Sequence, residues 1–152
     1  MKKLYVVGNK VSKSLSPTIF NYWFKKYKIK ASYGYLELSE RNFHKKIKGV
    51  LEKKDTLGLN VTIPFKNKII KHLGKIDAHA KKIGAVNCVT NKKTINGTNT
   101  DWTGYYKTLP NIKQTKNRKV IILGYGGASH AIHYVLKKRG FKDIIIFNLS
   151  LI

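Results

Sequence analysis

Residues 119–131 read KVIILGYGGASHA, and this stretch decides the fold class. The continuous apolar run at 119–124 is typical of a parallel strand that is covered on both faces. A glycine turn follows it and opens a helix, at Gly124, Gly126, Gly127 and Ala128. Glycines in a strand–turn–helix unit let the backbone approach a pyrophosphate, which the helix N-terminus then holds. A second apolar strand at 143–147 completes the opening β-α-β of a Rossmann-type dinucleotide-binding fold.

This glycine pattern is incomplete, and so is the unit that it opens. The third glycine position of the G-x-G-x-x-G fingerprint holds Ser129, so the strand–turn–helix context carries the prediction. Two strands and one helix cannot cover both faces of a sheet, so we expect the dinucleotide unit to be partial and the chain to be truncated. His130 and His133 have the spacing of metal ligands but lack a nearby Cys or acid pair. We therefore expect them on a solvated helix face, and no metal site.

The residues before 110 alternate between strand and helix patterns, which predicts an open α/β sheet. The expected strands lie at 4–8, 32–38 and 56–62, with a hairpin of 85–91 and 94–99 joined by Lys92 and Lys93. The expected helices begin at Ser16 and Ser39 as N-caps and continue along the chain at 65–73, 77–83 and 101–109. In the first helix, apolar residues at helical spacing predict a core face, at Ile19, Phe20, Trp23, Phe24 and Tyr27.

Composition narrows the class of protein. The chain carries 31 Lys and Arg against 7 Asp and Glu, a formal charge of +24. The bases are spread evenly and all but three are Lys, whereas readout of nucleic acid favours clustered Arg. We therefore expect a solvated basic surface and no nucleic-acid partner. Cys88 is the single cysteine, and no apolar run reaches the ~18 residues of a membrane span, so we expect a cytoplasmic protein without a membrane partner.

Three polar constellations are candidates for chemistry. Ser14 and Ser16 precede a helix, where two hydroxyls can face a small anion; the alternative is a loop residue and a cap. The stretch NVTIPFK (60–66) places Asn60, Thr62 and Lys66 at the carboxyl end of a strand, where α/β folds bind ligands. Lys66 could donate a proton there or act only as a charge partner.

The third constellation combines IGAVN (83–87) with GTNTDWTGY (97–105). Asn87 and Asn99 offer amides that can bind hydroxyl groups. Asp101 stands at a helix start, where its alternative role is that of an N-cap.

In this order and spacing, the motifs SLSP, NVTIPFK, IGAVN, GTNTDWTGY and GYGGA resemble those of the shikimate dehydrogenase family. The resemblance covers the whole chain but only the first part of the family's usual length. It implies a substrate-binding and catalytic domain at 1–105, a connecting helix end and linker at 106–118, and a partial NADP-binding domain at 119–152. It leaves open whether the protein is a homodimer.

The resemblance also assigns roles to individual residues. Ser14 and Ser16 match the pair that holds the substrate carboxylate, and Thr62, Asn87 and Asp101 match residues that bind ring hydroxyls. Lys66 matches the catalytic lysine and is paired with Asp101. The cofactor residues implied by the resemblance are Gly124, Gly126, Gly127, Ala128 and Asn148.

The implied reaction interconverts 3-dehydroshikimate and shikimate with NADP(H). Some positions depart from the family pattern. Lys13 and Phe20 replace its usual histidines, and Leu149 and Ser150 follow Asn148 where the family has Arg and Thr. The chain lacks both the Arg that favours NADP and an acid at the position that favours NAD.

Three other functions remain as alternatives. A quinate/shikimate dehydrogenase paralogue is compatible with the two serines, and a non-catalytic remnant would bind shikimate without turnover. A nucleic-acid binder is the last of these alternatives.

Overall fold

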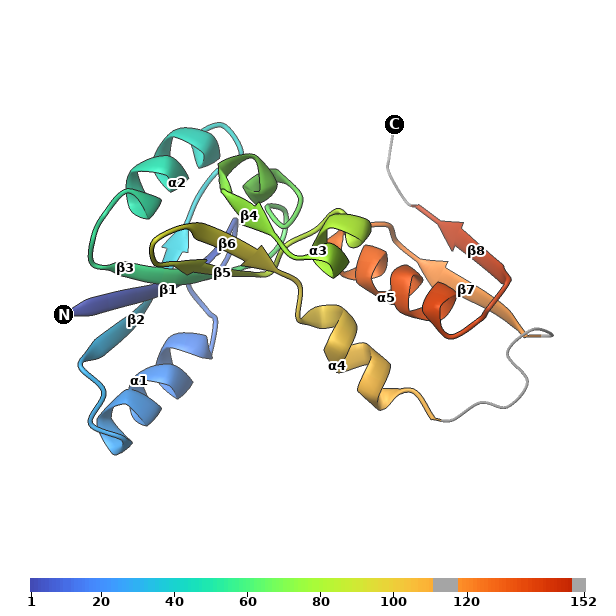
Figure 1. The fold of residues 1–152 in the computed structure, drawn as a ribbon, viewed down its shortest axis with the longest axis horizontal. Helices are drawn as coiled ribbons and strands as arrows, with labels where there is room; N and C mark the ends of the chain where they lie inside the picture. The colour runs from blue at the N-terminus through green and yellow to red at the C-terminus, as the bar shows by residue number, and fades with distance from the viewer. Residues whose placement is uncertain (111–117, 149–152) are drawn as a thin grey trace.

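The computed structural model describes residues 1–110 and 118–148, and it contains two β-sheets joined through helices (Figure 1). The strands are β1 (Lys2–Gly8), β2 (Ala31–Glu37), β3 (Thr56–Val61), β4 (Lys75–Ile76), β5 (Cys88–Asn91), β6 (Ile95–Thr98), β7 (Lys119–Leu123) and β8 (Asp143–Phe147). The helices are α1 (Ser16–Lys26), α2 (Phe43–Leu51), the 3₁₀ helix η1 (Lys68–His72), α3 (Ala78–Ile83), α4 (Asp101–Thr108) and α5 (Gly127–Lys138). This arrangement confirms the predicted α/β class.

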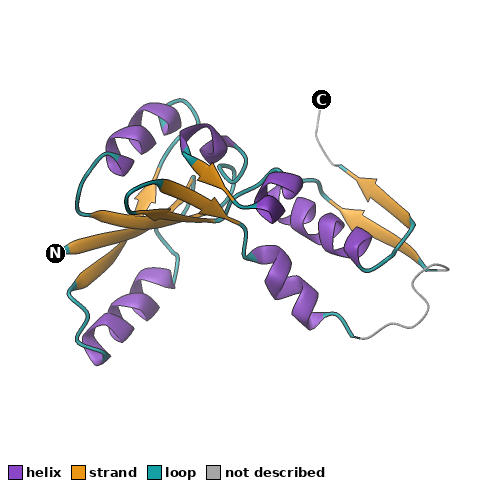
Figure 2. Cartoon of the chain, viewed as in Figure 1, coloured by secondary structure: helices purple, strands orange, loops and turns teal. Residues whose placement is uncertain are grey.

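The larger unit (residues 2–98) is built on a six-stranded sheet in the order β2-β1-β3-β5-β6-β4 (Figure 2). The strands β1, β2 and β3 are parallel, whereas β5 runs antiparallel to both β3 and β6. The sheet is therefore mixed and open. The carboxyl ends of β1 and β3 lie together, because Val7 is paired with Val61.

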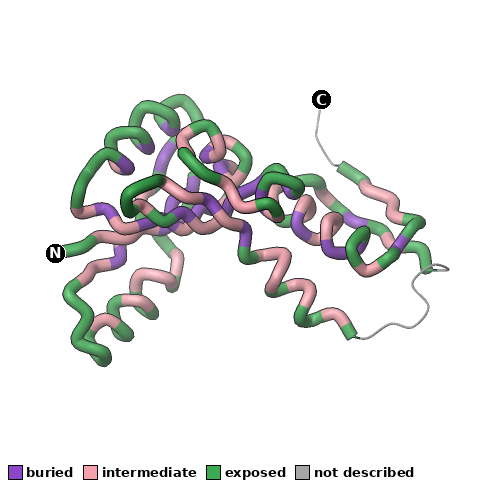
Figure 3. The backbone as a smooth tube through the Cα atoms, in the orientation of Figure 1, coloured by how far each residue is buried: buried purple, intermediate pink, exposed green. Residues whose placement is uncertain are grey.

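The core of this unit lies between the sheet and the helices α2 and η1 (Figure 3). Phe43 and Phe65 are fully buried and stacked, with ring centroids 4.1 Å apart. Phe43, Ile47 and Leu51 form the buried face of α2, as their spacing predicts. The segment that leads from β3 to Lys66 is thus fixed at Phe65 by the core.

The smaller unit (residues 119–147) consists of β7, α5 and β8, with the two strands parallel. Ala131, Val135 and Leu136 are the buried residues of α5. The two units meet where Ala131 of α5 packs against Ile83 and Ala85, with Trp102 and Tyr134 at the edge of this cluster.

A network of aromatic side chains adds to this junction. His79 of α3 stacks on Trp102 of α4 at 4.2 Å between ring centroids, and its Nδ1 lies 2.6 Å from the Tyr134 hydroxyl of α5. Arg139 lies over the Tyr106 ring and donates to the Tyr106 carbonyl at 3.1 Å. Three helices are therefore held to one another by side chains from both units.

Several expectations about helix starts and lengths are wrong. Ser16 is the first residue of α1 and not its cap; instead, the Ser14 hydroxyl accepts a hydrogen bond from the Ser16 N–H at 3.2 Å. The helix predicted from Ser39 begins at Phe43, because residues 40–42 form a turn first. The helix predicted at 65–73 is the 3₁₀ helix η1.

The hairpin and the first helix also differ from the prediction. Residues 92–94 connect β5 to β6, since Asn91 is paired with Ile95, so the loop includes Thr94 as well as the two lysines. Phe20 and Phe24 of α1 pack against Tyr33, but Ile19, Trp23 and Tyr27 are 43%, 45% and 63% exposed. The core-facing side of α1 is therefore narrower than the apolar spacing predicts.

Helix α1 is joined to the outer strand by a side chain. The Asn21 amide donates to the Tyr33 carbonyl at 2.8 Å, and its oxygen accepts from the Tyr33 N–H at 2.9 Å. Tyr33 stacks on Phe20 at 4.6 Å between ring centroids. The Asn21 side chain thus makes the two hydrogen bonds with Tyr33 that a neighbouring strand would make.

None of the helices in the described ranges is long and apolar enough to cross a membrane.

Candidate active site

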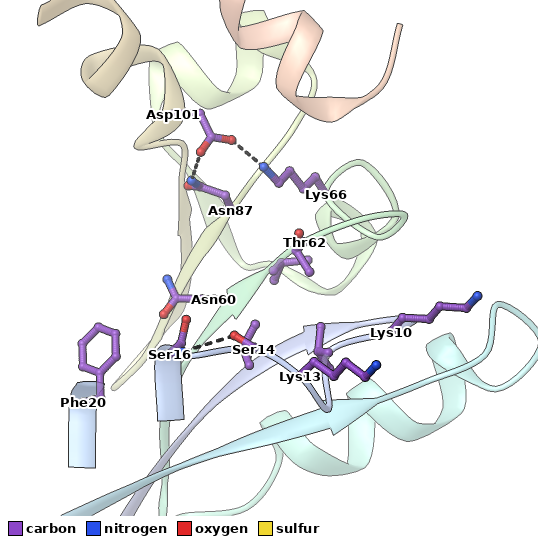
Figure 4. A pocket seen from close by; sticks show the side chains of 13 residues that line it. Lys10, Lys13, Ser14, Ser16, Phe20, Asn60, Thr62, Lys66, Asn87 and Asp101 are labelled. Atoms are coloured by element: carbon purple, nitrogen blue, oxygen red, sulfur yellow. Dashed lines mark hydrogen bonds and ion pairs between the residues drawn. The ribbon is translucent and has the colours of Figure 1, made fainter. Parts of the chain in front are cut away.

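An open cavity of about 620 Å³ lies at the carboxyl ends of β1 and β3, beside the start of α1 and α4 (Figure 4). The polar residues predicted from the sequence gather here, and the lining includes Ser14, Ser16, Thr62, Lys66, Asn87 and Asp101. These residues come from four separate segments of the chain. The structure therefore brings together the six side chains that the family resemblance assigns to substrate binding and catalysis, whereas Asn99 does not line the cavity.

Lys66 and Asp101 form the centre of one wall. The Lys66 ammonium nitrogen lies 2.6 Å from Asp101 Oδ2, and the Lys66 side chain is only 12% exposed. Asn87 Nδ2 donates to the other carboxylate oxygen, Oδ1, at 2.7 Å. Because an ammonium group has three N–H bonds, two remain for a ligand after the bond to Asp101 is made.

Asp101 is free for this contact because another residue supports the start of α4. The buried Asn99 accepts hydrogen bonds from the Asp101 and Trp102 N–H groups at 3.0 and 3.3 Å. Its amide donates to the Ala85 carbonyl at 2.9 Å. The N-cap role considered for Asp101 is therefore wrong, and Asn99 is a structural residue and not a hydroxyl ligand.

Ser14, Ser16 and Thr62 line the cavity away from the ion pair. In Figure 4, Thr62 lies between the two serines and the Lys66–Asp101 pair. The Thr62 N–H donates to the Val7 carbonyl at 2.8 Å, which fixes the residue at the end of the sheet. The Ser14 hydroxyl accepts from the Ser16 N–H and keeps its own proton available for a ligand.

Asn60 and Phe20 also line the cavity. Tyr33 donates its hydroxyl proton to Asn60 Oδ1 at 2.7 Å, which orients the Asn60 amide. Burial raises the pKa of the Tyr33 hydroxyl to about 12, so Tyr33 stays a hydrogen-bond donor at neutral pH. Asn60 belongs to a motif singled out above, but neither the motif nor its spacing indicates Tyr33.

Lys10 and Lys13 add positive charge to the cavity rim. Their loop is held by Glu37, whose carboxylate accepts from the Val11 and Ser12 N–H groups at 2.9 and 3.0 Å. These backbone hydrogen bonds lower the pKa of Glu37. Since Asp101 already balances Lys66, the two rim lysines leave the cavity with a positive field that suits an anion.

The glycine turn lies at the start of α5 in the smaller unit. Gly124 has a φ of 92°, which favours glycine, and its N–H donates to the Phe147 carbonyl at 2.7 Å. A Cβ atom at Gly124 or Gly126 would meet nothing within 4 Å, so the space above the turn is open. Ala128 is exposed, and Asn148 directly follows β8. Leu149 and Ser150 lie outside the described residues.

The two histidines of α5 have different surroundings. His130 Nδ1 lies 3.2 Å from the Ile83 carbonyl, so this side chain contacts the larger unit and is not on a purely solvated face. Burial, with Lys137 and His130 nearby, lowers the pKa of His133. Residues 1–110 and 118–148 contain no cluster of three or more His, Cys, Asp or Glu side chains suited to a metal ion.

Comparison with known proteins gives a consistent result. Residues 6–89 match the sequence profile of the shikimate dehydrogenase substrate binding domain. The chain is 36% identical over 149 residues to shikimate dehydrogenase (NADP(+)) from Thermotoga maritima, covering 98% of this chain and 56% of that protein. This chain thus spans little more than half the length of that relative.

Solved structures agree with the sequence comparison. The crystal structure of shikimate dehydrogenase from Thermotoga maritima has a TM-score of 0.85 at 35% identity, covering 98% of this chain and 56% of that one. Shikimate 5-dehydrogenase from Thermus thermophilus, in complex with NADP(H) and shikimate, has a TM-score of 0.80 at 27% identity. That match covers 99% of this chain and 57% of the other. This chain therefore belongs to the shikimate dehydrogenase family.

Proposed function

We propose that the protein is an NADP-dependent oxidoreductase that interconverts 3-dehydroshikimate and shikimate. The observation that carries this proposal is the Lys66–Asp101 pair, 2.6 Å apart, which shares one anion-suited cavity with Ser14 and Ser16. Family membership and the ligands named for the Thermus thermophilus structure support the same reaction.

Lys66 is the proposed general acid and base. Reduction of a ketone leaves negative charge on its oxygen, which a positioned donor must neutralise with a proton. The Lys66 ammonium donates that proton, and in the reverse direction the neutral amine takes it back. Asp101 holds the ammonium nitrogen in place, and Asn87 in turn fixes the Asp101 carboxylate.

The remaining polar residues are proposed to bind the substrate. The hydroxyls of Ser14 and Ser16 donate to the substrate carboxylate, and the charges of Lys10 and Lys13 favour its approach. Thr62, Asn87 and Asp101 bind the ring hydroxyls. Asp101 accepts from Lys66 and Asn87 and still has lone pairs for a substrate hydroxyl.

The glycine turn fits a dinucleotide, because open space lies above Gly124 and Gly126. Gly124, Gly126, Gly127 and Ala128 are proposed to hold the pyrophosphate of NADP(H), with Asn148 beside it. When bound, NADPH supplies the hydride. Gly126 and Gly127 of the turn line a second cavity of about 360 Å³ together with Lys66, so the turn lies beside the lysine.

The proposal keeps the domain boundaries and partners predicted from the sequence. The substrate-binding and catalytic domain is 1–105, the connection is 106–118, and the NADP-binding part is 119–152. Helix α4 extends across the first boundary to Thr108, and residues 111–117 lie outside the described ranges. The proposed protein is cytoplasmic and acts on a small molecule, with a homodimer left open and no nucleic-acid or membrane partner.

Substitution of the proposed acid tests the function. Lys66→Ala should lower kcat by about 10²–10⁴-fold with little change in KM, because only the proton transfer is lost. The exposed Lys71 is the matched control, and Lys71→Ala should leave both constants unchanged. Steady-state assays with shikimate and NADP⁺ measure the effect, and an unchanged kcat in Lys66→Ala rules the role out.

The alternatives are separated by ligand response. A quinate/shikimate paralogue turns over both acids at comparable kcat/KM. A non-catalytic remnant shows a thermal shift with shikimate but none with NADPH, because only a ligand that binds the folded state stabilises it. A nucleic-acid binder shows no shikimate response and binds DNA with a steep salt dependence.

A further inference from the structure

We propose that Gly127 is a positioning residue for Lys66, in addition to its place in the nucleotide turn. The first residue of α5 packs directly on the base of the Lys66 side chain. A Cβ atom at Gly127 would lie 2.9 Å from Lys66 Cβ and 3.1 Å from Lys66 Cδ. Carbon atoms are in favourable contact at about 3.5–4.0 Å, so any side chain at position 127 would collide with the lysine.

The other glycines of the turn do not share this contact. A Cβ atom at Gly126 or Gly124 would meet nothing within 4 Å. Gly124 is required for its positive φ, whereas Gly126 has extended backbone angles that other residues also adopt. Among these three glycines, close approach to Lys66 is therefore specific to Gly127.

Lys66 has little room to retreat from such a collision. Its backbone carbonyl accepts from the Val86 N–H at 2.7 Å, and the preceding Phe65 is fully buried against Phe43. The closest atom is Lys66 Cβ, which is fixed to the backbone and cannot rotate away as the end of the side chain could.

Helix α5 is restrained as well. Ala131, one turn further along the helix, is buried against Ile83 and Ala85 of the larger unit. A side chain at position 127 must therefore tilt the helix or move Lys66. Because Lys66 Nζ lies only 2.6 Å from Asp101 Oδ2, a shift of the lysine stem weakens this ion pair.

The inference rests on the proposed function for its catalytic meaning, but the contact can be tested without it. Wild type, Gly127→Ala and the control Gly49→Ala are compared as the 152-residue chain without nucleotide. Gly49 is an exposed residue of α2, and a Cβ atom there would meet nothing within 4 Å. The first measurement is the rate at which an acetylating reagent modifies the Lys66 amine, determined by mass spectrometry. The exposed Lys71 and Lys82 in the same samples are internal references. The second measurement is shikimate affinity by calorimetry.

We expect faster acetylation of Lys66 in Gly127→Ala alone, with the reference lysines unchanged. Shikimate should bind this variant about tenfold more weakly, because the collision disturbs the hydrogen bond between Lys66 and Asp101. A hydrogen bond between charged groups is strong enough to account for a tenfold change in affinity. Gly49→Ala should match wild type in both measurements. Equal Lys66 rates in all three proteins, or an equal rise at the reference lysines, overturn the inference.

Failure of the proposed function gives a different result. If no variant binds shikimate, wild type included, but Lys66 still reacts faster only in Gly127→Ala, the positioning inference stands and the proposed function fails. If Gly127→Ala does not fold, nuclear Overhauser contacts between the Gly127 Hα and Lys66 methylene protons decide in the wild type. Their presence supports the inference, and their absence overturns it.

Discussion

The two sheets of this molecule differ in how completely they are covered. In the larger unit, Phe43, Ile47 and Phe65 are fully buried between the sheet and its helices. In the smaller unit, α5 covers one face of β7 and β8, while Ile121, Leu123 and Phe147 on these strands are 56%, 78% and 53% exposed. The burial of Ile122 between two exposed neighbours shows that only one face of β7 is packed.

This difference bears on the proposed site, because its catalytic pair and its glycine turn lie in units that are packed to different extents. The proposed catalytic pair belongs to segments anchored by the closed core and by Asn99. The glycine turn belongs to the partly covered sheet, and it is held in place by contacts of α5 with α3 and α4. We therefore expect substitutions in the two units to affect stability very differently.

The largest expected effect is in the core of the larger unit. Phe43→Ala should lower the free energy of unfolding by about 3–5 kcal/mol, because it removes a buried aromatic ring and leaves a cavity. Leu123→Ala, at a 78% exposed position in the smaller unit, should change it by about 0.5 kcal/mol or less. Urea denaturation measures both. Equal losses would remove the distinction between the units.

A smaller effect is expected at the support of Asp101. Asn99→Ala should cost about 1–3 kcal/mol, since the Ala85 carbonyl and two N–H groups of α4 lose a buried partner. It should also weaken shikimate binding by loosening Asp101. Asn67→Ala, at an exposed position, is the control and should be neutral in both calorimetry and denaturation. Unchanged stability in Asn99→Ala would contradict its structural role.

The junction between the units should respond more weakly. Tyr134→Phe removes the hydroxyl that lies 2.6 Å from His79 Nδ1 and should cost about 1 kcal/mol. We expect faster amide exchange in α5, β7 and β8, with little change in β1 and β3. Tyr125→Phe, at a 44% exposed position of the same unit, should leave exchange unchanged. A uniform increase throughout the chain would show that the units do not open separately.

The weakest effect at neutral pH concerns Tyr33 of the larger unit. Its pKa is raised by burial from 10.0 to about 12, so the folded state favours the neutral hydroxyl. The stability that this preference provides is complete below pH 10 and is lost as the pH rises toward 12. Denaturation at pH 9 to 12 should show this fall in wild type and a shallower one in Tyr33→Phe. Identical profiles would exclude Tyr33 as the cause.

Periodicity and turn chemistry predict most of the fold. The apolar runs around β1, β3, β7 and β8 all form strands, the Phe43–Ile47–Leu51 face of α2 is buried, and the helix expected at 77–83 is α3. The run at 119–124 is typical of a strand covered on both faces, but only one face of β7 is packed. The two-residue strand β4 has no sequence signal of its own, because it exists only through pairing with β6. The prediction of core along the exposed side of α1 is wrong because spacing alone does not show what lies opposite a helix.

The site could be predicted as a set of residues but not as a geometry. Sequence motifs indicate Lys66 and Asp101, which stand 35 positions apart, yet their contact depends on how β3 and α4 are placed. The roles of Asn99 and Tyr33 depend on burial, which no local pattern reveals. The contact between Gly127 and Lys66 joins two motifs that were interpreted separately.

The pairing of Asn21 with Tyr33 bears on aggregation. Strand β2 is at the outer edge of its sheet, where unpaired peptide groups can recruit a strand from another molecule. The Asn21 side chain already makes hydrogen bonds to both the N–H and the carbonyl of Tyr33. A strand from another molecule therefore cannot pair with β2 at Tyr33, in the middle of the strand. One amide side chain thus protects an edge strand that carries two tyrosines against fibril-like association.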